Sequence, residues 1–117
     1  MLKVYQCEAC NKTILSKEAL NLQGWKELVP GSVDASVEKH VPVVSQEGNM
    51  ILVNVGSVTH PMSEEHLIEW IAVETEKGYQ VKYLKANDTP VVTFRLTDEE
   101  KAVAVYAYCN LHGLWMK

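Results

Sequence analysis

Residues 66–84 read HLIEWIAVETEKGYQVKYL, and this stretch decides the fold class. Two runs rich in valine, isoleucine, tyrosine and tryptophan, residues 66–74 and 79–84, lie on either side of the turn-forming pair Lys77-Gly78. Branched and aromatic side chains fit a pleated sheet, and glycine marks the turn between two strands. The stretch therefore predicts two β-strands joined by a short turn.

The same pattern continues on both sides of this stretch. Further runs of strand-forming residues are separated by clusters of glycine, asparagine, aspartate and proline. Short strands at a spacing of roughly 8–12 residues are typical of a β-sandwich or barrel. The additional predicted strands are residues 41–44, 50–55, 91–96 and 102–108.

Two segments have some helical character. Residues 13–20 have a helical composition, but the segment is short and we assign it to the N-terminal part of the chain. Residues 96–107 begin with Thr97 and Glu100, a spacing found at helix starts. The alternating alanines and valines that follow fit a strand better, so we predict a turn over residues 97–101 and then a strand.

Composition and charge limit the classes of protein that this chain can represent. With 117 residues, 47% of them hydrophobic and 22% charged, it can form one globular domain with one core. Its formal net charge of -4 and its lack of basic runs argue against a nucleic-acid surface. The longest apolar stretches are about six residues, well short of the ~20 that a membrane helix needs. The N-terminus lacks the apolar run of a signal peptide, so we expect a cytoplasmic protein.

All four histidines lie in three short clusters that also contain the last of the three cysteines. Each cluster alone has an ordinary interpretation, because a single histidine at a strand end is usually a solvated loop residue and a single buried cysteine usually fills space. Together they indicate a metal site, since imidazole and thiolate suit a transition metal best. The clusters are Glu38-Lys39-His40-Val41-Pro42, His60-Pro61-Met62-Ser63-Glu64-Glu65-His66 and Cys109-Asn110-Leu111-His112-Gly113-Leu114-Trp115.

The spacing inside the clusters indicates how the donor atoms can converge. An extended strand would separate His60 and His66 by ~20 Å, whereas Pro61 and the polar residues after it predict a loop that turns both rings toward one centre. Cys109 and His112 are three residues apart, and a turn there places sulfur and imidazole on one side, with backbone N–H groups directed at the sulfur. Five donors exceed the four of a structural zinc site and favour a square-pyramidal redox iron with one free position.

These clusters resemble those of superoxide reductases, the desulfoferrodoxin and neelaredoxin family. The elements Glu-Lys-His-x-Pro, His-Pro-Met-x-x-x-His and Cys-x-x-His-Gly-x-Trp occur in the family's order, within a match that covers residues 28–117. The resemblance implies an all-β chain: an immunoglobulin-like β-sandwich of about seven strands with a small N-terminal segment. It also implies one iron per chain at an exposed end of the sandwich. The implied ligands are His40, His60, His66 and His112 in the equatorial plane, with Cys109 axial.

The resemblance further implies an enzyme that reduces superoxide to hydrogen peroxide by one electron and protects against oxidative stress. Glu38 matches the glutamate that can occupy the sixth position of the ferric iron. Lys39 matches the lysine that attracts superoxide and helps to protonate the product. The family's usual electron donor is a rubredoxin. The oligomeric state usual in the family suggests a homodimer or homotetramer, and so do the unpaired edge strands of a sandwich.

The N-terminal segment departs from the family's two-iron members. Those members hold a second iron with a Cys-x-x-Cys and a later Cys-Cys pair, whereas here only Cys7 and Cys10 remain and a Leu-Gln dipeptide stands in place of the second pair. Two thiolates cannot complete a tetrahedral sulfur site, so we expect no second iron. Residues 1–30 are then a vestigial desulforedoxin-like segment, and residues 31–117 the iron-binding domain. The open alternative is a metal shared between the cysteine pairs of two chains.

Two other functions stay open on the residues alone. A non-catalytic β-sandwich binding module could carry a structural zinc, although zinc rarely takes five ligands. An electron-transfer iron protein without superoxide chemistry would lack the free coordination position. Colour separates the two metals, because zinc is colourless and a thiolate-bound ferric site absorbs visible light.

Overall fold

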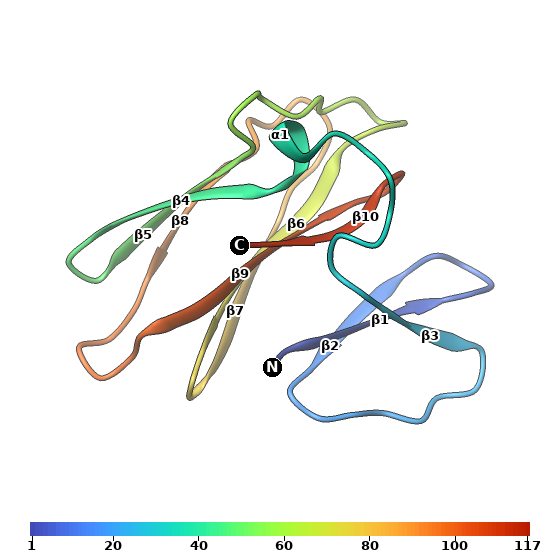
Figure 1. The fold of residues 1–117 in the computed structure, drawn as a ribbon, viewed down its shortest axis with the longest axis horizontal. Coiled ribbons are helices and arrows are strands. Elements are labelled where there is room, and N and C mark those ends of the chain that lie inside the picture. The colour runs from blue at the N-terminus through green and yellow to red at the C-terminus, as the bar shows by residue number, and fades with distance from the viewer.

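The computed structural model describes all residues from Met1 to Lys117 and shows an almost wholly β structure (Figure 1). All strands belong to three antiparallel sheets, and the single helix is one turn long. The strands are β1 (Lys3–Cys7), β2 (Thr13–Ser16), β3 (Trp25–Leu28), β4 (Pro42–Glu47), β5 (Met50–Val55), β6 (Ile68–Thr75), β7 (Gly78–Tyr83), β8 (Val91–Arg95), β9 (Ala102–Cys109) and β10 (Gly113–Met116). The helix, α1, spans Val37–His40 and ends on a histidine.

The central part of the molecule is a sandwich of two sheets. One sheet has the strand order β4-β5-β8 and the other the order β10-β9-β6-β7, with every pair antiparallel. The first, second and fifth strands of the sandwich therefore form one sheet, and the other four form the second. This is the division of an immunoglobulin-like sandwich in which the fourth strand has joined the second sheet. It confirms the predicted fold class.

The core between the two sheets explains the alternation in the sequence. Alternate residues of β5 and β8 are buried, including Val53 and Phe94, while their neighbours are more exposed. Ile71 of β6 and Val105 of β9 meet them from the other sheet in one apolar cluster. Cys109, the last residue of β9, belongs to the same cluster and is fully buried.

Strand β6 is buried on both faces, which is why it reads as an almost continuous apolar run. One face meets the sandwich core, and the other is covered by the N-terminal sheet, whose strand order is β2-β1-β3. Leu2 and Val4 pack there with Trp70 and Tyr106 of the four-stranded sheet. Each fully buried apolar side chain of this size stabilises the fold by about 1.5–3 kcal/mol, so the contact fixes the N-terminal sheet on the sandwich.

A buried carboxylate links the same two layers. Glu74 of β6 accepts hydrogen bonds from the Leu2 N–H and the Tyr106 hydroxyl, both at 2.9 Å, and pairs with the Lys17 ammonium at 2.7 Å. Burial alone would raise the pKa of Glu74, but these three donors outweigh burial and lower it. The carboxylate therefore stays ionised and holds both the chain start and the residue after β2 against β6.

The predicted strands agree with the observed ones to within a few residues at each end. Residues 50–55 form β5 as predicted, and the segment after the Thr97 turn is strand β9 and not a helix. Thr97 donates from its N–H and its hydroxyl to the Glu100 carboxylate, at 3.1 and 3.0 Å, and so closes that turn. Residues 13–16 form β2, because pairing with β1 outweighs the helical composition of the segment. The sequence did not predict α1, β10 or any of the three N-terminal strands β1, β2 and β3.

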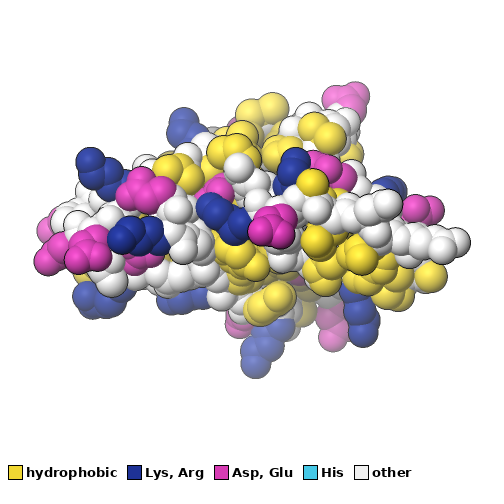
Figure 2. All heavy atoms as spheres, turned by 90° about the horizontal axis from the view of Figure 1, so that it is seen from below, with side chains coloured by type: hydrophobic (Ala, Val, Ile, Leu, Met, Phe, Trp, Pro, Cys, Tyr) yellow, Lys and Arg dark blue, Asp and Glu magenta, His cyan; other side chains and the backbone are white.

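The three segments that carry the histidines gather at the upper end of the sandwich in Figure 1, around α1 and the β9–β10 turn. Figure 2 shows the molecule from below, where charges of both signs and apolar side chains are mixed and no histidine is visible. The structure has no helix with the length and apolar character that crossing a bilayer requires.

Candidate metal centre

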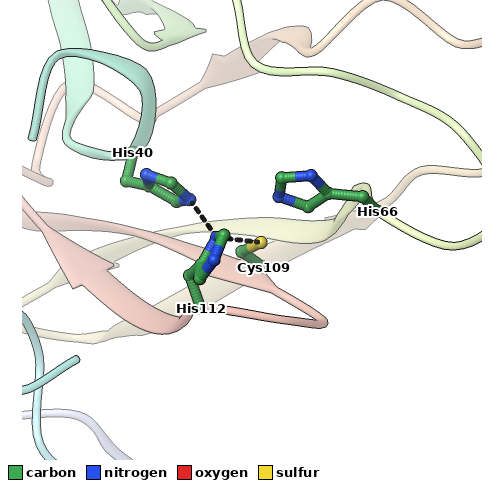
Figure 3. A group of neighbouring side chains, drawn as sticks. All are labelled: His40, His66, Cys109 and His112. Atoms are coloured by element: carbon green, nitrogen blue, oxygen red, sulfur yellow. Dashed lines mark hydrogen bonds between the residues drawn. The ribbon is translucent and has the colours of Figure 1, made fainter. Parts of the chain in front are cut away.

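Three segments far apart in the sequence bring their donor side chains to one point. His40 comes from the end of α1, His60 and His66 from the loop between β5 and β6, and Cys109 and His112 from the β9–β10 turn. Figure 3 shows four of these side chains directed toward one another. One nitrogen or sulfur atom from each of these four, His40, His66, Cys109 and His112, lies within 4.8 Å of the others.

The four imidazole rings stand at the corners of an approximate square. Going round it, the ring centroids of His40 and His60 and of His60 and His66 are 4.7 Å apart, and those of His66 and His112 and of His112 and His40 are 4.9 Å apart. Every neighbouring pair is close to perpendicular, at 78° to 86°. The diagonal from His40 to His66 is 6.4 Å. His60 therefore completes the set that the other three histidines begin.

The nitrogen atoms inside the square face one another. The Nε2 atom of His40 lies 3.2 Å from His60 Nε2 and 3.1 Å from His112 Nδ1. The Cys109 sulfur lies 3.9 Å from the same His112 nitrogen. The His66 Nε2 atom is buried and has no hydrogen-bond partner, which is unusual for a polar atom inside a protein.

Backbone carbonyls fix the tautomers of two of these rings. His40 Nδ1 lies 2.7 Å from the Ser36 carbonyl, and His60 Nδ1 lies 2.6 Å from the Pro61 carbonyl. A carbonyl oxygen only accepts, so both Nδ1 atoms carry the hydrogen and both Nε2 atoms present a lone pair to the centre. The two lone pairs point at each other, and the buried His66 nitrogen has no hydrogen-bond partner. One metal cation bound between these atoms would accept all three lone pairs. The residues therefore fit a metal ion of the kind that binds imidazole.

The electrostatics of the site favour neutral imidazoles. Burial, with smaller contributions from the neighbouring histidine rings, lowers the pKa of His60 to about 4, although the hydrogen bond to the Pro61 carbonyl opposes the change. Burial also lowers the pKa of His40 and of His66, again with a contribution from the other rings. Neutral imidazole is the form that binds metals, so the chain holds these side chains ready at neutral pH.

Cys109 is placed to become a thiolate when a cation is present. Burial raises the pKa of its thiol, while hydrogen bonds from the backbone N–H groups of His112 and Leu111 oppose the rise. These are the N–H groups that the spacing of the third cluster predicted. A metal ion supplies the positive charge that deprotonates a coordinating thiol, and the two N–H groups then stabilise the sulfur charge.

The loop that carries His60 and His66 is closed by its own hydrogen bonds. Ser63 and His66 exchange backbone hydrogen bonds of 3.0 and 3.2 Å, so the chain turns back over four residues. The Met62 sulfur accepts the Ile68 N–H at 3.4 Å, which ties the loop to the start of β6. The predicted tight loop between the two histidines is confirmed.

Asn110 connects this loop to the β9–β10 turn. Its side-chain oxygen accepts the Leu67 N–H at 3.0 Å, and its amide group donates to the Glu65 carbonyl at 3.0 Å. Its backbone N–H donates to the Leu67 carbonyl at 3.2 Å. These three bonds bracket His66 on both sides and set its distance from Cys109 and His112.

Two further residues position the rings, and the sequence alone did not assign them a role. Trp115 stacks on His40 at a centroid distance of 4.9 Å and donates its indole N–H to the His112 carbonyl at 3.0 Å. Gly56 lies against α1, where a Cβ atom would come 2.6 Å from the Glu38 carbonyl oxygen. Trp115 stands inside the third cluster, but nothing in the sequence marked Gly56 or the clamp made by Asn110.

Glu38 and Lys39 are exposed on α1, directly before His40. Their charges act on the pKa of His40, after the larger effects of burial, the Ser36 carbonyl and the His112 ring. Neither carboxylate nor ammonium has a hydrogen-bond partner, so both are free to face an incoming molecule. Cys7 and Cys10 lie in the N-terminal sheet, outside this group.

A family model described as Desulfoferrodoxin matches residues 32–117, a range that includes every residue of the site. The chain belongs to the desulfoferrodoxin family. A desulfoferrodoxin from Syntrophotalea carbinolica is 41% identical to it over 97% of this chain and 94% of that protein. A superoxide reductase from Pyrococcus horikoshii is 33% identical over 72% of this chain and 88% of that protein.

A solved structure supports the same relation over the whole fold. The crystal structure of the superoxide reductase from Treponema pallidum matches with a TM-score of 0.82 and 40% identity, and the match covers 89% of this chain and 92% of that one. Superoxide reductases of this family use iron, and the square of histidines beside Cys109 is a place where one metal ion can bind.

Proposed function

We propose that this chain is a superoxide reductase that converts superoxide to hydrogen peroxide at one iron ion. The observation that carries the proposal is the square of four imidazoles beside the buried Cys109 thiol, with opposed lone pairs and an unpaired His66 nitrogen inside it. No packing role accounts for four histidine rings facing one another.

We assign His40, His60, His66, His112 and Cys109 as the ligands of that ion. Iron held there would supply the electron that superoxide takes up on its way to peroxide. The chain contributes four imidazoles, three of which (His40, His60 and His66) burial keeps unprotonated, and a sulfur that is shielded from water in the sandwich core. The His112 and Leu111 N–H groups stabilise negative charge on that sulfur.

Lys39 is the residue we assign to guiding the substrate. It is exposed one position before His40, and its charge reaches His66, whose pKa is lowered first by burial and also by this ammonium. A cation at the rim attracts the superoxide anion against the net negative charge of the chain, and its Nζ atom can give a proton to the product. The exposed Glu38 carboxylate is assigned to cover the site in the oxidised resting protein.

Each superoxide takes up one electron and two protons, so the site needs a reductant after every turnover. We propose an external electron carrier, a rubredoxin, in that role, and the cytoplasm as the compartment. We also propose a homodimer or homotetramer. In support of an oligomer, the sheet β4-β5-β8 carries three partly exposed apolar side chains, Val43, Leu52 and Val91, that a second chain could cover.

We further propose that residues 1–30 and 31–117 are separate structural units. The first unit contributes a sheet of its own and none of the five assigned ligands. The family match begins at residue 32, close to the proposed boundary.

The proposal is tested by measuring the stoichiometry of the reaction. Iron-loaded protein, given a steady flux of superoxide and reduced rubredoxin, should oxidise one donor molecule for each superoxide and release peroxide without oxygen. Equal amounts of oxygen and peroxide, with the donor left reduced, would mean dismutation and would contradict the proposal.

The same preparation separates the alternative functions. A zinc-stabilised binding module would be colourless and would not contain one iron ion per chain. An electron-transfer protein would exchange electrons with rubredoxin but would not be re-oxidised faster by superoxide than by other oxidants of similar potential.

A further inference from the structure

The cysteine pair of the N-terminal sheet has no part in the site described above. Cys7 ends β1, and Cys10 follows it in the turn that leads to β2, at the right-hand edge of Figure 1. Both thiols are free, Cys7 half-buried and Cys10 exposed. Small molecules in the solvent can therefore reach the pair.

Three backbone hydrogen bonds fix this turn. The Cys7 carbonyl accepts the Asn11 N–H at 2.9 Å, and the Cys7 N–H donates to the Lys12 carbonyl at 2.8 Å. The Glu8 N–H donates to the Gly24 carbonyl at 2.9 Å, which ties the turn to the loop before β3. The chain reverses direction over these residues, so Cys7 and Cys10 belong to one tight turn. A disulfide requires the Cα atoms of its two cysteines to lie within about 7 Å of each other.

The turn also favours the reactive form of one thiol. A hydrogen bond from the Cys10 thiol, helped by the backbone N–H groups of Cys10 and Ala9, lowers the pKa of Cys7. The thiolate is the nucleophilic form of cysteine, and a second thiol beside it can resolve the first oxidation product.

One chain cannot use this pair as a complete sulfur site for a metal. The neighbouring turn, closed by a hydrogen bond of 3.2 Å from the Trp25 N–H to the Leu22 carbonyl, contains no cysteine. The group of metal-binding side chains in this structure includes neither Cys7 nor Cys10. Each thiol of the pair therefore has the other as its natural partner.

We propose that Cys7 and Cys10 form a reversible dithiol–disulfide couple that hydrogen peroxide oxidises. The Cys7 thiolate attacks one peroxide oxygen, the O–O bond breaks, and the products are a sulfenic acid on Cys7 and hydroxide. The Cys10 sulfur then attacks the Cys7 sulfur, the S–O bond breaks, and a disulfide forms. In total, the two sulfurs give two electrons to hydrogen peroxide. The two thiols also supply two protons, so the peroxide is reduced to two molecules of water.

The inference rests on the proposed function only for the source of the peroxide, since superoxide reduction would release it from the same molecule. A dithiol reductant of the thioredoxin class would return the pair to its reduced form by thiol–disulfide exchange. The N-terminal sheet would then carry a second redox step, separate from the metal site.

The test adds one equivalent of hydrogen peroxide to the full-length, iron-loaded chain, followed by alkylation and intact-mass analysis. The wild type should lose two alkylatable thiols together and two hydrogens in mass, at least about 10-fold faster than a free cysteine reacts. Cys10→Ser should instead hold a sulfenic acid on Cys7, which a cyclic dione traps. A dithiol reductant should restore both thiols in the wild type.

Three results would overturn the proposal. They are no disulfide between the two residues, oxidation no faster than that of free cysteine, or a metal that co-purifies with the pair and blocks its alkylation. Cys109→Ser should leave the disulfide reaction intact, because Cys109 lies in the sandwich core and the metal site, outside the N-terminal sheet. Failure of superoxide reduction and failure of the couple therefore give different results.

Discussion

Two turns in this chain place a cysteine three residues before a second donor, and their chemistry differs. In both, backbone N–H groups of the turn hydrogen-bond to the first sulfur. The pKa of Cys7 is lowered by the Cys10 thiol and these N–H groups, whereas burial raises the pKa of Cys109. The local turn thus directs backbone N–H groups at the sulfur in both cases. The surrounding fold differs, because it leaves Cys7 accessible to solvent and buries Cys109 beside four imidazoles.

The largest expected effect separates the sulfurs of the two turns. Cys109→Ser should abolish the visible thiolate-to-iron absorption of the oxidised protein, because the sulfur that donates the charge is gone. The double variant Cys7→Ser/Cys10→Ser is the matched control and should keep the full absorption. If the band were lost in the control and kept in Cys109→Ser, the iron would be bound by Cys7 and Cys10, and the assignment of Cys109 as a ligand would be contradicted.

A second change weakens the metal site without removing a ligand. Asn110→Ala deletes the two side-chain bonds that hold the His66 loop to the β9–β10 turn, at 3.0 Å each. Iron affinity, measured by competition with a chelator, should fall by about 10-fold to 100-fold. Asn49→Ala removes an exposed side-chain bond to Asp98 and should leave the affinity unchanged. Equal affinities in both variants would remove Asn110 from the site.

Glu74→Gln addresses the contact between the N-terminal sheet and the sandwich. Loss of the charge at this buried carboxylate should lower the free energy of unfolding by about 1–3 kcal/mol at neutral pH. Chemical denaturation followed by tryptophan fluorescence measures it. Glu27→Gln breaks an exposed pair with Lys3 of 3.4 Å and should change stability far less.

The pH dependence of that contact has a definite sign. The pKa of Glu74 is lower in the folded protein than the ordinary value of 4.5, because its three donors outweigh the effect of burial. Its stabilisation is therefore complete above the ordinary glutamate pKa and is lost as the pH falls through the lowered one. Wild-type stability should fall more steeply in this acidic range than that of Glu74→Gln. Parallel curves would contradict the assignment.

Lys39→Ala should give the smallest effect. Removing the ammonium at the rim should slow the encounter with superoxide by less than about 10-fold and reduce its dependence on ionic strength. Pulse radiolysis measures this rate while iron stays bound. Lys77→Ala changes the net charge equally at the exposed turn between β6 and β7 and should leave the rate unchanged. A matching decrease in both variants would indicate a general charge effect.

Much of the site could be predicted from sequence because its donors are chemically distinctive. His40, His60, His66, Cys109 and His112 stand out as the few metal-binding side chains at turns, and residues 60–66 contain the proline and polar residues of a loop. The structure brings these side chains together, and their role as ligands of one ion stays a prediction.

The supporting residues could not be predicted in the same way. Gly56 matters only because α1 packs on it, and Asn110 only because β6 and the β9–β10 turn lie side by side. Both depend on contacts between segments far apart in the chain. Strands β1 to β3 were missed for a related reason, since each is short and is fixed by pairing and by packing on β6.

X-ray absorption at the iron edge, on the reduced and iron-loaded protein, tests the central claim most directly. A shell of imidazole nitrogens with one sulfur per iron is expected, and that sulfur should vanish in Cys109→Ser while it persists in Cys7→Ser/Cys10→Ser. A shell made only of sulfur atoms, or a sulfur that survives in Cys109→Ser, would contradict an iron held by the four histidines and Cys109.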